Sequence, residues 1–153
     1  MFFVGEYEHA LDGKQRFAIP AEIRDLLMPE VHGEAFIAAP GANGCLWLWP
    51  EKTFHELAGA LGGSLLGDED IQQLERMIFS QAARVPVDSA GRVRVPDRLL
   101  QTFGLSGSVM ILGVRDHLEL MDPKTWNEEQ TRLRPKQGDL WRRARQALAE
   151  RKA

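Results

Sequence analysis

Two short stretches of the chain repeat the same polar pattern. The first reads DGKQRFAIP from Asp12 to Pro20, and the second reads DSAGRVRVP from Asp88 to Pro96, at an offset of 76 residues. In each copy an Asp precedes an Arg by four positions. A carboxylate at the start of a turn accepts hydrogen bonds from the backbone N–H groups that follow it. Turn chemistry therefore explains either copy alone, but it does not explain why both copies contain the Arg.

Catalytic chemistry fits these residues poorly. Two Asp residues from two similar halves resemble the dyad of aspartic proteases, in which one carboxyl has a raised pKa. Here Lys14, Arg16 and Arg92 favour two ionised carboxylates instead. The sequence also has no His-Glu-x-x-His motif, no Gly-rich phosphate loop and only one cysteine, Cys45. We expect a protein that is not an enzyme and has no cofactor and no metal site.

The same basic residues are well suited to binding an anionic surface. Lys14, Arg16, Arg92 and Arg94 lie at or beside the two related turns. Basic side chains on a protruding β-element can contact phosphates and enter a DNA groove. In this interpretation each Asp fixes its turn, so that the Arg is presented in one direction.

The elements that must position these turns are duplicated. LWLWPEKTFHE (residues 46–56) resembles LELMDPKTWNE (residues 118–128) at an offset of 72. Two matched blocks in the same order predict two half-domains that share a pseudo-symmetric core, because a solenoid needs at least three repeats. The predicted organisation is a first half, a connecting helix with the second half, and a basic C-terminal helix, over residues 1–66, 67–131 and 132–153.

The predicted elements follow from periodicity and from turn residues. Val93 and Val95 alternate with Arg92 and Arg94, which places the arginines on one face of a strand. A helix is expected after Pro20 and after Pro96, with a stop at Gly104. Further helices are predicted over residues 53–61 and 68–81, and hairpins over residues 7–20 and 83–96. Strand pairs are predicted from residues 34–40 with 45–50 and from residues 108–114 with 117–121.

Aromatic and apolar residues raise the question of assembly. The chain has four Trp and seven Phe residues. We expect Trp47 and Trp49 to lie on opposite faces of one strand, with one of them against a neighbouring subunit or with both covered by the chain's own helices. The apolar stripe of residues 71–78 is expected to be core or interface.

Charge is distributed unevenly along the chain. The net charge is −3, but residues 132–153 carry eight basic and two acidic side chains, a net of +6, and the rest carries −9. We expect a basic amphipathic helix with Asp139 as its N-cap. This helix could contact DNA, dock on the acidic body of a neighbour or be solvated, and we favour docking. The opening MFFVGEYEH lacks a basic n-region and no apolar run is long enough for a membrane span, so a reducing, cytoplasmic protein is expected. Nucleoid association is expected from the DNA-binding interpretation of the two turns.

The twin Asp-x-x-x-Arg segments, each followed by a short helix, resemble the signatures of the MraZ family. The LWLWP and ELMDPKTW segments resemble that family as well. The resemblance implies an α+β fold: a pseudo-twofold, AbrB-like swapped-hairpin β-barrel with short peripheral helices. It also implies a homo-oligomer, a closed ring, that binds repeated boxes in double-stranded promoter DNA and regulates the division and cell-wall gene cluster.

Carried over to this sequence, the resemblance implies a set of site residues. The expected DNA-binding residues are Lys14, Gln15, Arg16, Arg92 and Arg94. The expected loop-positioning residues are Asp12, Gly13, Asp88 and Gly91. The family pattern has Gly before the Arg, as at Gly91, whereas this chain has Gln15, so the first loop is expected to turn differently. The alternative function is a duplicated barrel that acts as a protein-interaction or antitoxin-like module.

Overall fold

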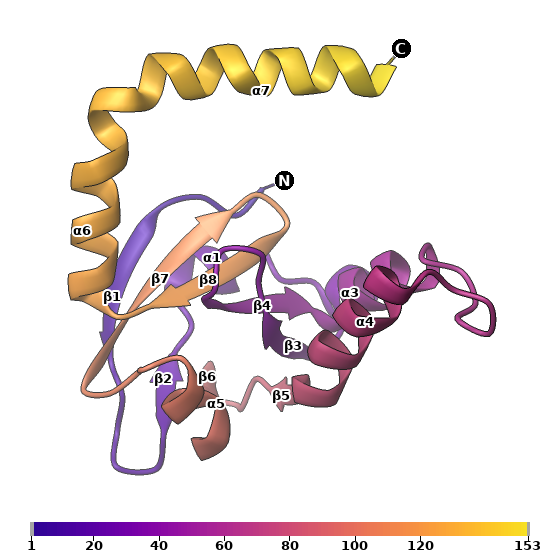
Figure 1. The fold of residues 1–153 in the computed structure, drawn as a ribbon. Coiled ribbons are helices and arrows are strands. Elements are labelled where there is room, and N and C mark those ends of the chain that lie inside the picture. The colour runs from indigo at the N-terminus through magenta and orange to yellow at the C-terminus, as the bar shows by residue number, and fades with distance from the viewer. Residues whose placement is uncertain (1, 153) are drawn as a thin grey trace. The chain divides into compact units, whose positions relative to one another are not determined.

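The computed structural model describes residues 2–152, which divide into two compact units (Figure 1). The first unit ends at Asp122 and contains every strand that is described, in two sheets with short helices. The second unit begins at Pro123 and is helical. The first unit is therefore a mixed α+β structure, as the sequence predicts.

The strands form two sets of four. The first half has β1 (Glu6–Ala10), β2 (Arg16–Ala18), β3 (Ala35–Pro40) and β4 (Leu46–Pro50). The second half has β5 (Ala83–Pro86), β6 (Arg92–Arg94), β7 (Ser108–Val114) and β8 (His117–Met121). The large sheet has the order β1-β7-β8-β4-β3-β5, and β2 pairs with β6 in a separate two-stranded sheet. Each strand of the first half has an equivalent four strands later, so that β1 corresponds to β5 and β4 to β8. Replacing every strand by its equivalent gives the same order in reverse, so the topology has a pseudo-twofold axis.

The predicted hairpins over residues 7–20 and 83–96 are wrong. The turns form, but β1 pairs with β7 and β5 pairs with β3, while β2 pairs antiparallel with β6. This exchange between halves lets Phe17 and Val93, each 1% exposed, lie opposite one another in a shared apolar layer. A local hairpin would leave each of them without that partner. The strand order closes neither sheet on itself within residues 2–152, so the predicted swapped-hairpin barrel is not confirmed.

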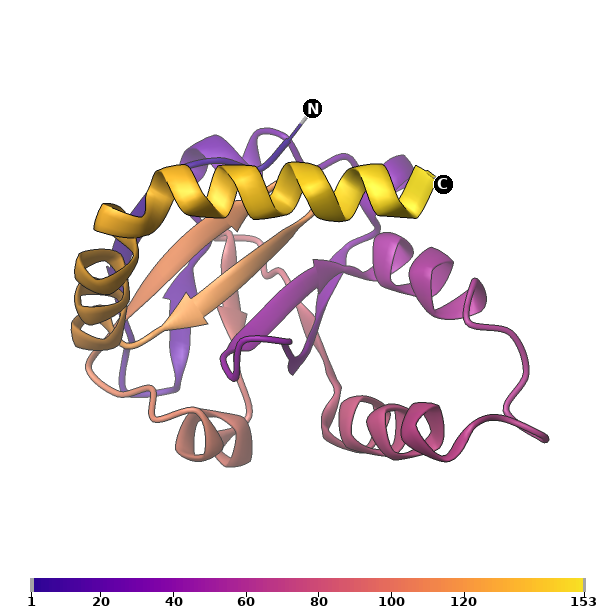
Figure 2. The ribbon, with the colours of Figure 1, turned by 45° about the horizontal axis from the view of Figure 1, so that its top comes forward.

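Four helices of the first unit begin within two residues of the predicted starts, whereas the helix over residues 29–32 was not predicted. They are α1 (Ala21–Arg24), α2 (Pro29–His32), α3 (Glu51–Gly59), α4 (Glu69–Gln81) and α5 (Asp97–Thr102). Pro20, Pro50 and Pro96 directly precede α1, α3 and α5. Asp68 caps α4 by accepting a hydrogen bond from the backbone N–H of Asp70 at 2.8 Å. A long loop joins α3 and α4 beyond one end of β3 and β4 (Figure 2).

The second unit consists of α6 (Pro123–Leu133), the short 3₁₀ helix η1 (Arg134–Lys136) and α7 (Gln137–Lys152). α7 begins two residues before Asp139, so the prediction that Asp139 is the N-cap is wrong. Its carboxylate instead forms ion pairs with Arg142 and Arg143 in the next turn. No helix within residues 2–152 has the length and apolar character needed to cross a membrane.

Trp47 and Trp49 lie on the same face of β4, which corrects the prediction of opposite faces. Side chains alternate along a strand, so residues two apart share a face. Leu46 and Leu48 are fully buried, whereas the two Trp rings are partly exposed and enclose His117, with ring centroids 4.1 and 4.5 Å from its ring. The partly exposed face of β4 is thus an aromatic surface.

His117 belongs to a polar cluster beneath these rings. Its two ring nitrogens lie 2.8 Å from a Glu119 oxygen and 3.0 Å from an Asp116 oxygen. Asn43 donates a hydrogen bond to Glu119 at 3.0 Å and accepts one from the Trp47 indole at 2.8 Å. Burial by itself lowers the pKa of His117, but the hydrogen bonds to Glu119 and Asp116 raise it above the ordinary value of 6.5. When protonated, the His117 ring pairs with the buried Glu119 carboxylate.

His117 should make stability depend on pH. Because its pKa is higher in the folded chain than its ordinary value, its contribution is present below pH 6.5 and is lost as pH rises through the folded pKa. We expect the melting temperature of the wild type to fall as pH rises above about 6.5, and the His117→Gln variant to lose this part of the dependence. His55 is exposed, so His55→Gln is the matched control. Identical pH profiles for wild type and His117→Gln would contradict the assignment.

Candidate nucleic-acid interface

The first Asp-x-x-x-Arg segment forms a compact loop between β1 and β2. One oxygen of the Asp12 carboxylate accepts hydrogen bonds from the backbone N–H groups of Lys14 (2.8 Å) and Arg16 (2.9 Å). The other oxygen accepts from Nε of Arg16 at 2.8 Å. The backbone N–H of Asp12 donates to the carbonyl of Arg16 at 2.9 Å and closes the loop. One carboxylate therefore fixes both the turn and the direction of the Arg.

The second segment builds the same loop between β5 and β6. The Asp88 carboxylate accepts from the backbone N–H groups of Ala90 and Arg92, both at 2.9 Å, and from Nε of Arg92 at 3.1 Å. The backbone N–H of Asp88 donates to the carbonyl of Arg92 at 2.9 Å. The two copies thus share every hydrogen bond that defines the loop.

The pKa values of both Asp residues are lowered. The backbone N–H of Arg16 contributes most to lowering the pKa of Asp12 to about 2, and the backbone N–H of Arg92 likewise lowers the pKa of Asp88. Both carboxylates are ionised at neutral pH. Because each pair is partly exposed, it contributes little to the free energy of folding. Its main effect is to hold an Arg side chain in one orientation.

Gln15 adopts the left-handed conformation that Gly91 adopts in the second loop. The φ angles are 59° at Gln15 and 78° at Gly91, and their N–H groups donate to the carbonyls of Asp12 and Asp88 at 3.1 and 2.9 Å. The expectation that the first loop turns differently is therefore wrong. Gly13 lies outside the left-handed region, and a Cβ at this position would meet no atom within 4 Å. The first loop therefore does not use Gly13 to reach a positive φ.

Each loop is held by an arginine from the other half of the chain. Arg94 donates from Nη2 to the Gln15 side chain at 3.0 Å and from Nε to the Lys14 carbonyl at 3.2 Å. Arg24 donates to the carbonyl of Ala90 at 3.2 Å. The Arg94 contacts help to explain how a non-glycine residue is held at position 15. The sequence analysis did not identify Arg24, because nothing local marks a contact that spans 66 residues.

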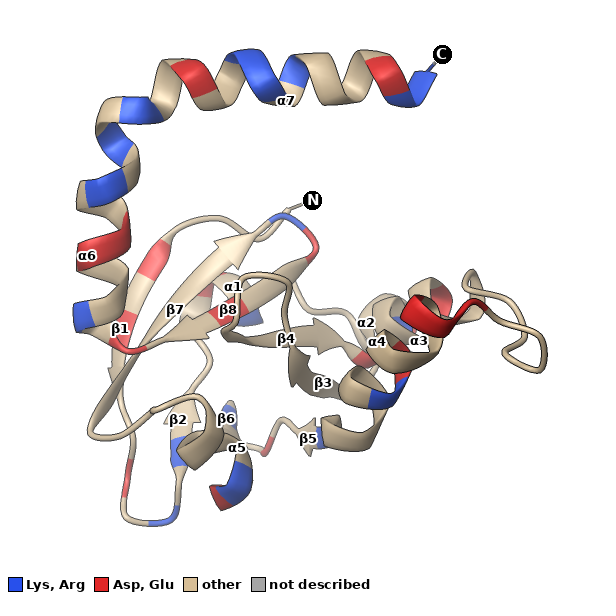
Figure 3. Cartoon of the chain, in the orientation of Figure 1, with Lys and Arg blue, Asp and Glu red and all other residues tan. Residues whose placement is uncertain are grey.

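The structure brings the predicted basic residues together on one ribbon. In the β2–β6 pair, Arg16 lies opposite Arg94 and Ala18 lies opposite Arg92. These side chains share one face, and the buried Phe17 and Val93 point to the other. Because the strands are antiparallel, the two loops lie at opposite ends of the ribbon, and Figure 3 shows basic segments at both strands. Lys14 is exposed within the first loop.

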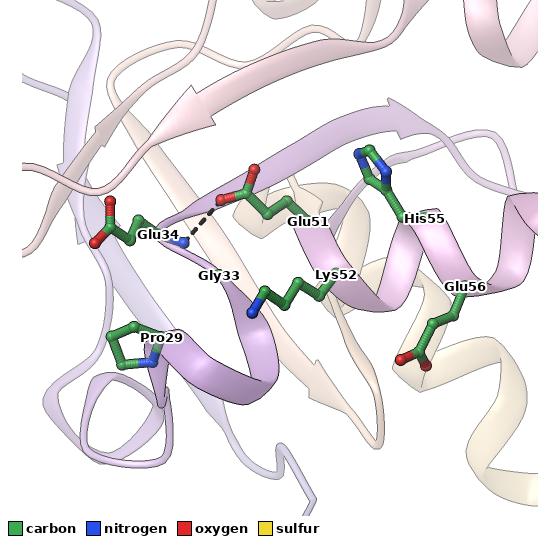
Figure 4. A pocket seen from close by; sticks show the side chains of 7 residues that line it. All are labelled: Pro29, Gly33, Glu34, Glu51, Lys52, His55 and Glu56. Atoms are coloured by element: carbon green, nitrogen blue, oxygen red, sulfur yellow. Dashed lines mark hydrogen bonds between the residues drawn. The ribbon is translucent and has the colours of Figure 1, made fainter.

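A hollow of about 590 Å³ lies beside α2 and α3 (Figure 4). Its most polar groups already have partners in the chain. Glu51 accepts from the backbone N–H of Glu34 at 2.8 Å and pairs with Arg84 at 3.0 Å, and Lys52 donates to the carbonyl of Glu30 at 2.9 Å. Across residues 2–152, no three His, Cys, Asp or Glu side chains are grouped as metal ligands. The ribbon and its loops are therefore the stronger candidate site.

The two loops should respond differently to exchanged residues. Gly91→Gln should lower the free energy of unfolding by about 1–2 kcal/mol, because Gln would have a positive φ. Its Cβ would also meet the Arg24 side chain. Gln15→Gly should stay within about 1 kcal/mol of the wild type, because relief of strain opposes the larger backbone entropy of the unfolded chain. Urea unfolding measures both changes, and a Gly91→Gln variant as stable as the wild type would disprove the assignment.

Comparison with known proteins shows a family similarity that covers far more of the chain than the two loops. The matching family is described as MraZ protein and as antitoxin-like. Its model matches residues 2–62 and 78–137. Residues 63–77 and 138–153 lie outside the match. Each of the two matched stretches contains one of the Asp–Arg loops.

Three relatives named "Transcriptional regulator MraZ" agree with this result. The protein of Roseiflexus sp. (strain RS-1) is 37% identical over 124 residues, 81% of this chain and 83% of the relative. The Heliobacterium modesticaldum protein is 33% identical, over 87% of this chain and 90% of the relative. The Lactiplantibacillus plantarum protein is 34% identical, over 92% of this chain and 95% of the relative. With its twin loops and with family matches in both halves, the chain belongs to the MraZ family.

Proposed function

We propose that this chain is a transcription regulator that binds double-stranded promoter DNA sequence-specifically through its two Asp–Arg loops. The observation that carries the proposal is the repeated loop geometry. Two ionised Asp residues hold two Arg side chains through the same hydrogen bonds, at the two ends of one basic ribbon. A protein that needed only stable turns would not require the Arg in both loops.

The geometry of each loop suits contact with DNA. Asp12 engages Nε of Arg16, and within residues 2–152 the two terminal nitrogens of that guanidinium have no hydrogen-bond partner; the same holds for Arg92. Terminal guanidinium nitrogens can donate in pairs to a guanine edge or to a phosphate. A two-stranded ribbon also has the width that the major groove admits. Preorganised Arg side chains lose less conformational entropy on binding.

Assembly of several subunits would make weak contacts effective. We propose a closed ring of copies that binds repeated boxes, as the twin signatures of the MraZ family suggest, with the division and cell-wall gene cluster as the target. Each subunit would add two loops, and binding of the first box would raise the effective concentration of the others. A net charge of −3 is compatible with this function, because the basic loops are concentrated on one ribbon.

A protein-interaction module is the second candidate function. It is supported by the exposed apolar side chains of α3 and α4, which include Leu57, Leu74 and Met77. A mobility shift with the DNA upstream of the chain's own gene, and with a scrambled duplex of equal length, separates the two functions. A sequence-specific regulator retards the first duplex at much lower protein concentration. Equal retardation of both duplexes would favour the interaction module.

Arg16→Ala should abolish sequence-specific binding with little effect on the fold. The substitution removes one partly exposed ion pair, so the free energy of unfolding should change by no more than about 0.5 kcal/mol. Fluorescence anisotropy with promoter and scrambled DNA measures the loss of specificity. Arg76→Ala on α4 removes the same charge from an exposed helix and is the matched control. Normal promoter binding by Arg16→Ala would show that the first loop is not part of the interface.

Asp12→Ala should impair both binding and stability. The variant loses three hydrogen bonds to the Asp12 side chain, so the loop loosens and Arg16 is no longer held in one direction. We expect a lower melting temperature together with weaker promoter binding, whereas Arg16→Ala affects binding alone. A variant with wild-type melting and wild-type affinity would refute the positioning role of Asp12.

A further inference from the structure

Exposed apolar side chains are concentrated in two segments of the chain. Of the sixteen large hydrophobic residues that are exposed within residues 2–152, eight lie between Leu57 and Phe79 and three lie on α7. Leu65 and Leu66, in the loop between α3 and α4, are 92% and 94% exposed. Large contiguous apolar patches are uncommon on monomers and usually mark interaction sites. Both segments are therefore candidates for contact with a partner.

The first segment encloses an apolar groove. It lies between α3, α4 and the outer face of β4, with a volume of about 320 Å³. The lining includes Trp47, Trp49, Leu57, Leu74, Met77 and Phe79. Phe54 of α3 and Phe79 of α4 meet edge to face, with ring centroids 5.6 Å apart. The groove is thus an aromatic and aliphatic channel rather than a polar site.

The charges around the groove restrict its occupant. Residues 51–81 carry six acidic and two basic side chains, and Figure 3 shows acidic segments on α3 and α4. DNA and anionic lipid would be repelled by this surface. The same face of a second copy would bring acidic residues against acidic residues. A basic segment with an apolar stripe complements the groove best.

α7 has this chemistry. Leu140, Trp141, Ala144 and Leu148 are spaced to form one stripe along sixteen helical residues. Residues 137–152 carry five basic and two acidic side chains. Trp141 is 63% exposed, and Arg145 lies over its ring at 5.7 Å from the centroid. A helix of this length spans about 24 Å, which is enough to lie along the 13-residue α4.

Each of the two segments lies mostly outside the residues that the family model matches. The match leaves out residues 63–77, which include Leu74 and Met77, and residues 138–153, which include Trp141 and Leu148. Both parts are rich in exposed apolar residues, and their net charges are opposite. The chemistry of the two parts is therefore complementary, with apolar side chains on both and opposite net charge.

We propose that α7 of one copy docks in the groove between α3 and α4 of a second copy. This contact rests on the proposed homo-oligomer, to which it adds a head-to-tail interface. Trp141 and Leu148 fill the groove, and the arginines beside them face the carboxylates of α3 and α4. Each copy supplies one helix and one groove, so the contact can continue around a ring.

Two variants of the full chain test the docking. The helix variant carries Trp141→Ala and Leu148→Ala, and the groove variant carries Leu74→Asp and Met77→Asp. Each should self-associate at least about tenfold more weakly than the wild type in sedimentation velocity, because interface Trp and Leu anchors are lost. Gln146→Ala on α7 and Gln73→Ala on α4 are the matched controls and should assemble normally. Melting curves check the fold, and Leu74→Ser replaces the Asp variant if melting is lowered.

Mixing the two variants gives the decisive result. The helix variant retains an intact groove and the groove variant retains an intact α7, so the mixture should associate about tenfold more tightly than either variant alone. No gain on mixing would overturn the proposal, and so would wild-type assembly of either variant. Promoter binding by the wild type is measured in parallel. Wild-type binding and assembly with no effect of the variants would reject the docking alone, whereas a monomeric wild type would reject the proposed assembly as well.

Discussion

The pairing of β2 with β6 is the contact on which the rest of the first unit depends. The ribbon has only three residues in each strand, too few for independent stability. It is supported by the burial of Phe17 and Val93 on one face and by the two Asp turns at its ends. Arg94 and Arg24 then attach each loop to the opposite half. The ribbon thus connects the apolar core directly to the basic surface.

The Asp–Arg loops show how a weak interaction can have a large structural effect. A partly exposed ion pair contributes at most about 1 kcal/mol to folding. The same carboxylate also accepts two backbone hydrogen bonds, so it restricts the loop and the Arg together. The low pKa of Asp12 means that this restriction persists across the neutral pH range. Orientation, rather than stability, is what the repeated pair provides.

Much of this arrangement is encoded locally and could be predicted. The offset between Asp12 and Asp88 indicates the duplication, and the alternation of Val93 with the arginines correctly predicts the two faces of β6. Proline positions predict where α1 and α5 begin. The shared face of Trp47 and Trp49 also follows from strand periodicity, because residues two apart point to the same side. The prediction of opposite faces did not apply this rule.

Other features depend on contacts that are distant in sequence. A turn signal fits a local hairpin and an exchanged strand equally well, so only the packing of Phe17 against Val93 distinguishes the two. The left-handed backbone at Gln15 depends on bonds from Arg94, 79 residues away. Arg24 supports the second loop from a helix that the sequence analysis associated with the first. Residue types alone do not reveal such long-range support.

The exchange of strands also sets the timing of folding during synthesis. Glu6 of β1 pairs with Leu112 of β7, so the first strand has no partner until more than a hundred further residues have been made. At translation rates of about 5–20 residues per second, β1 remains unpaired for roughly 5–20 seconds. Pairings of such high sequence separation are also slow to form. The first half therefore cannot complete its strand pairing before most of the second half has been synthesised.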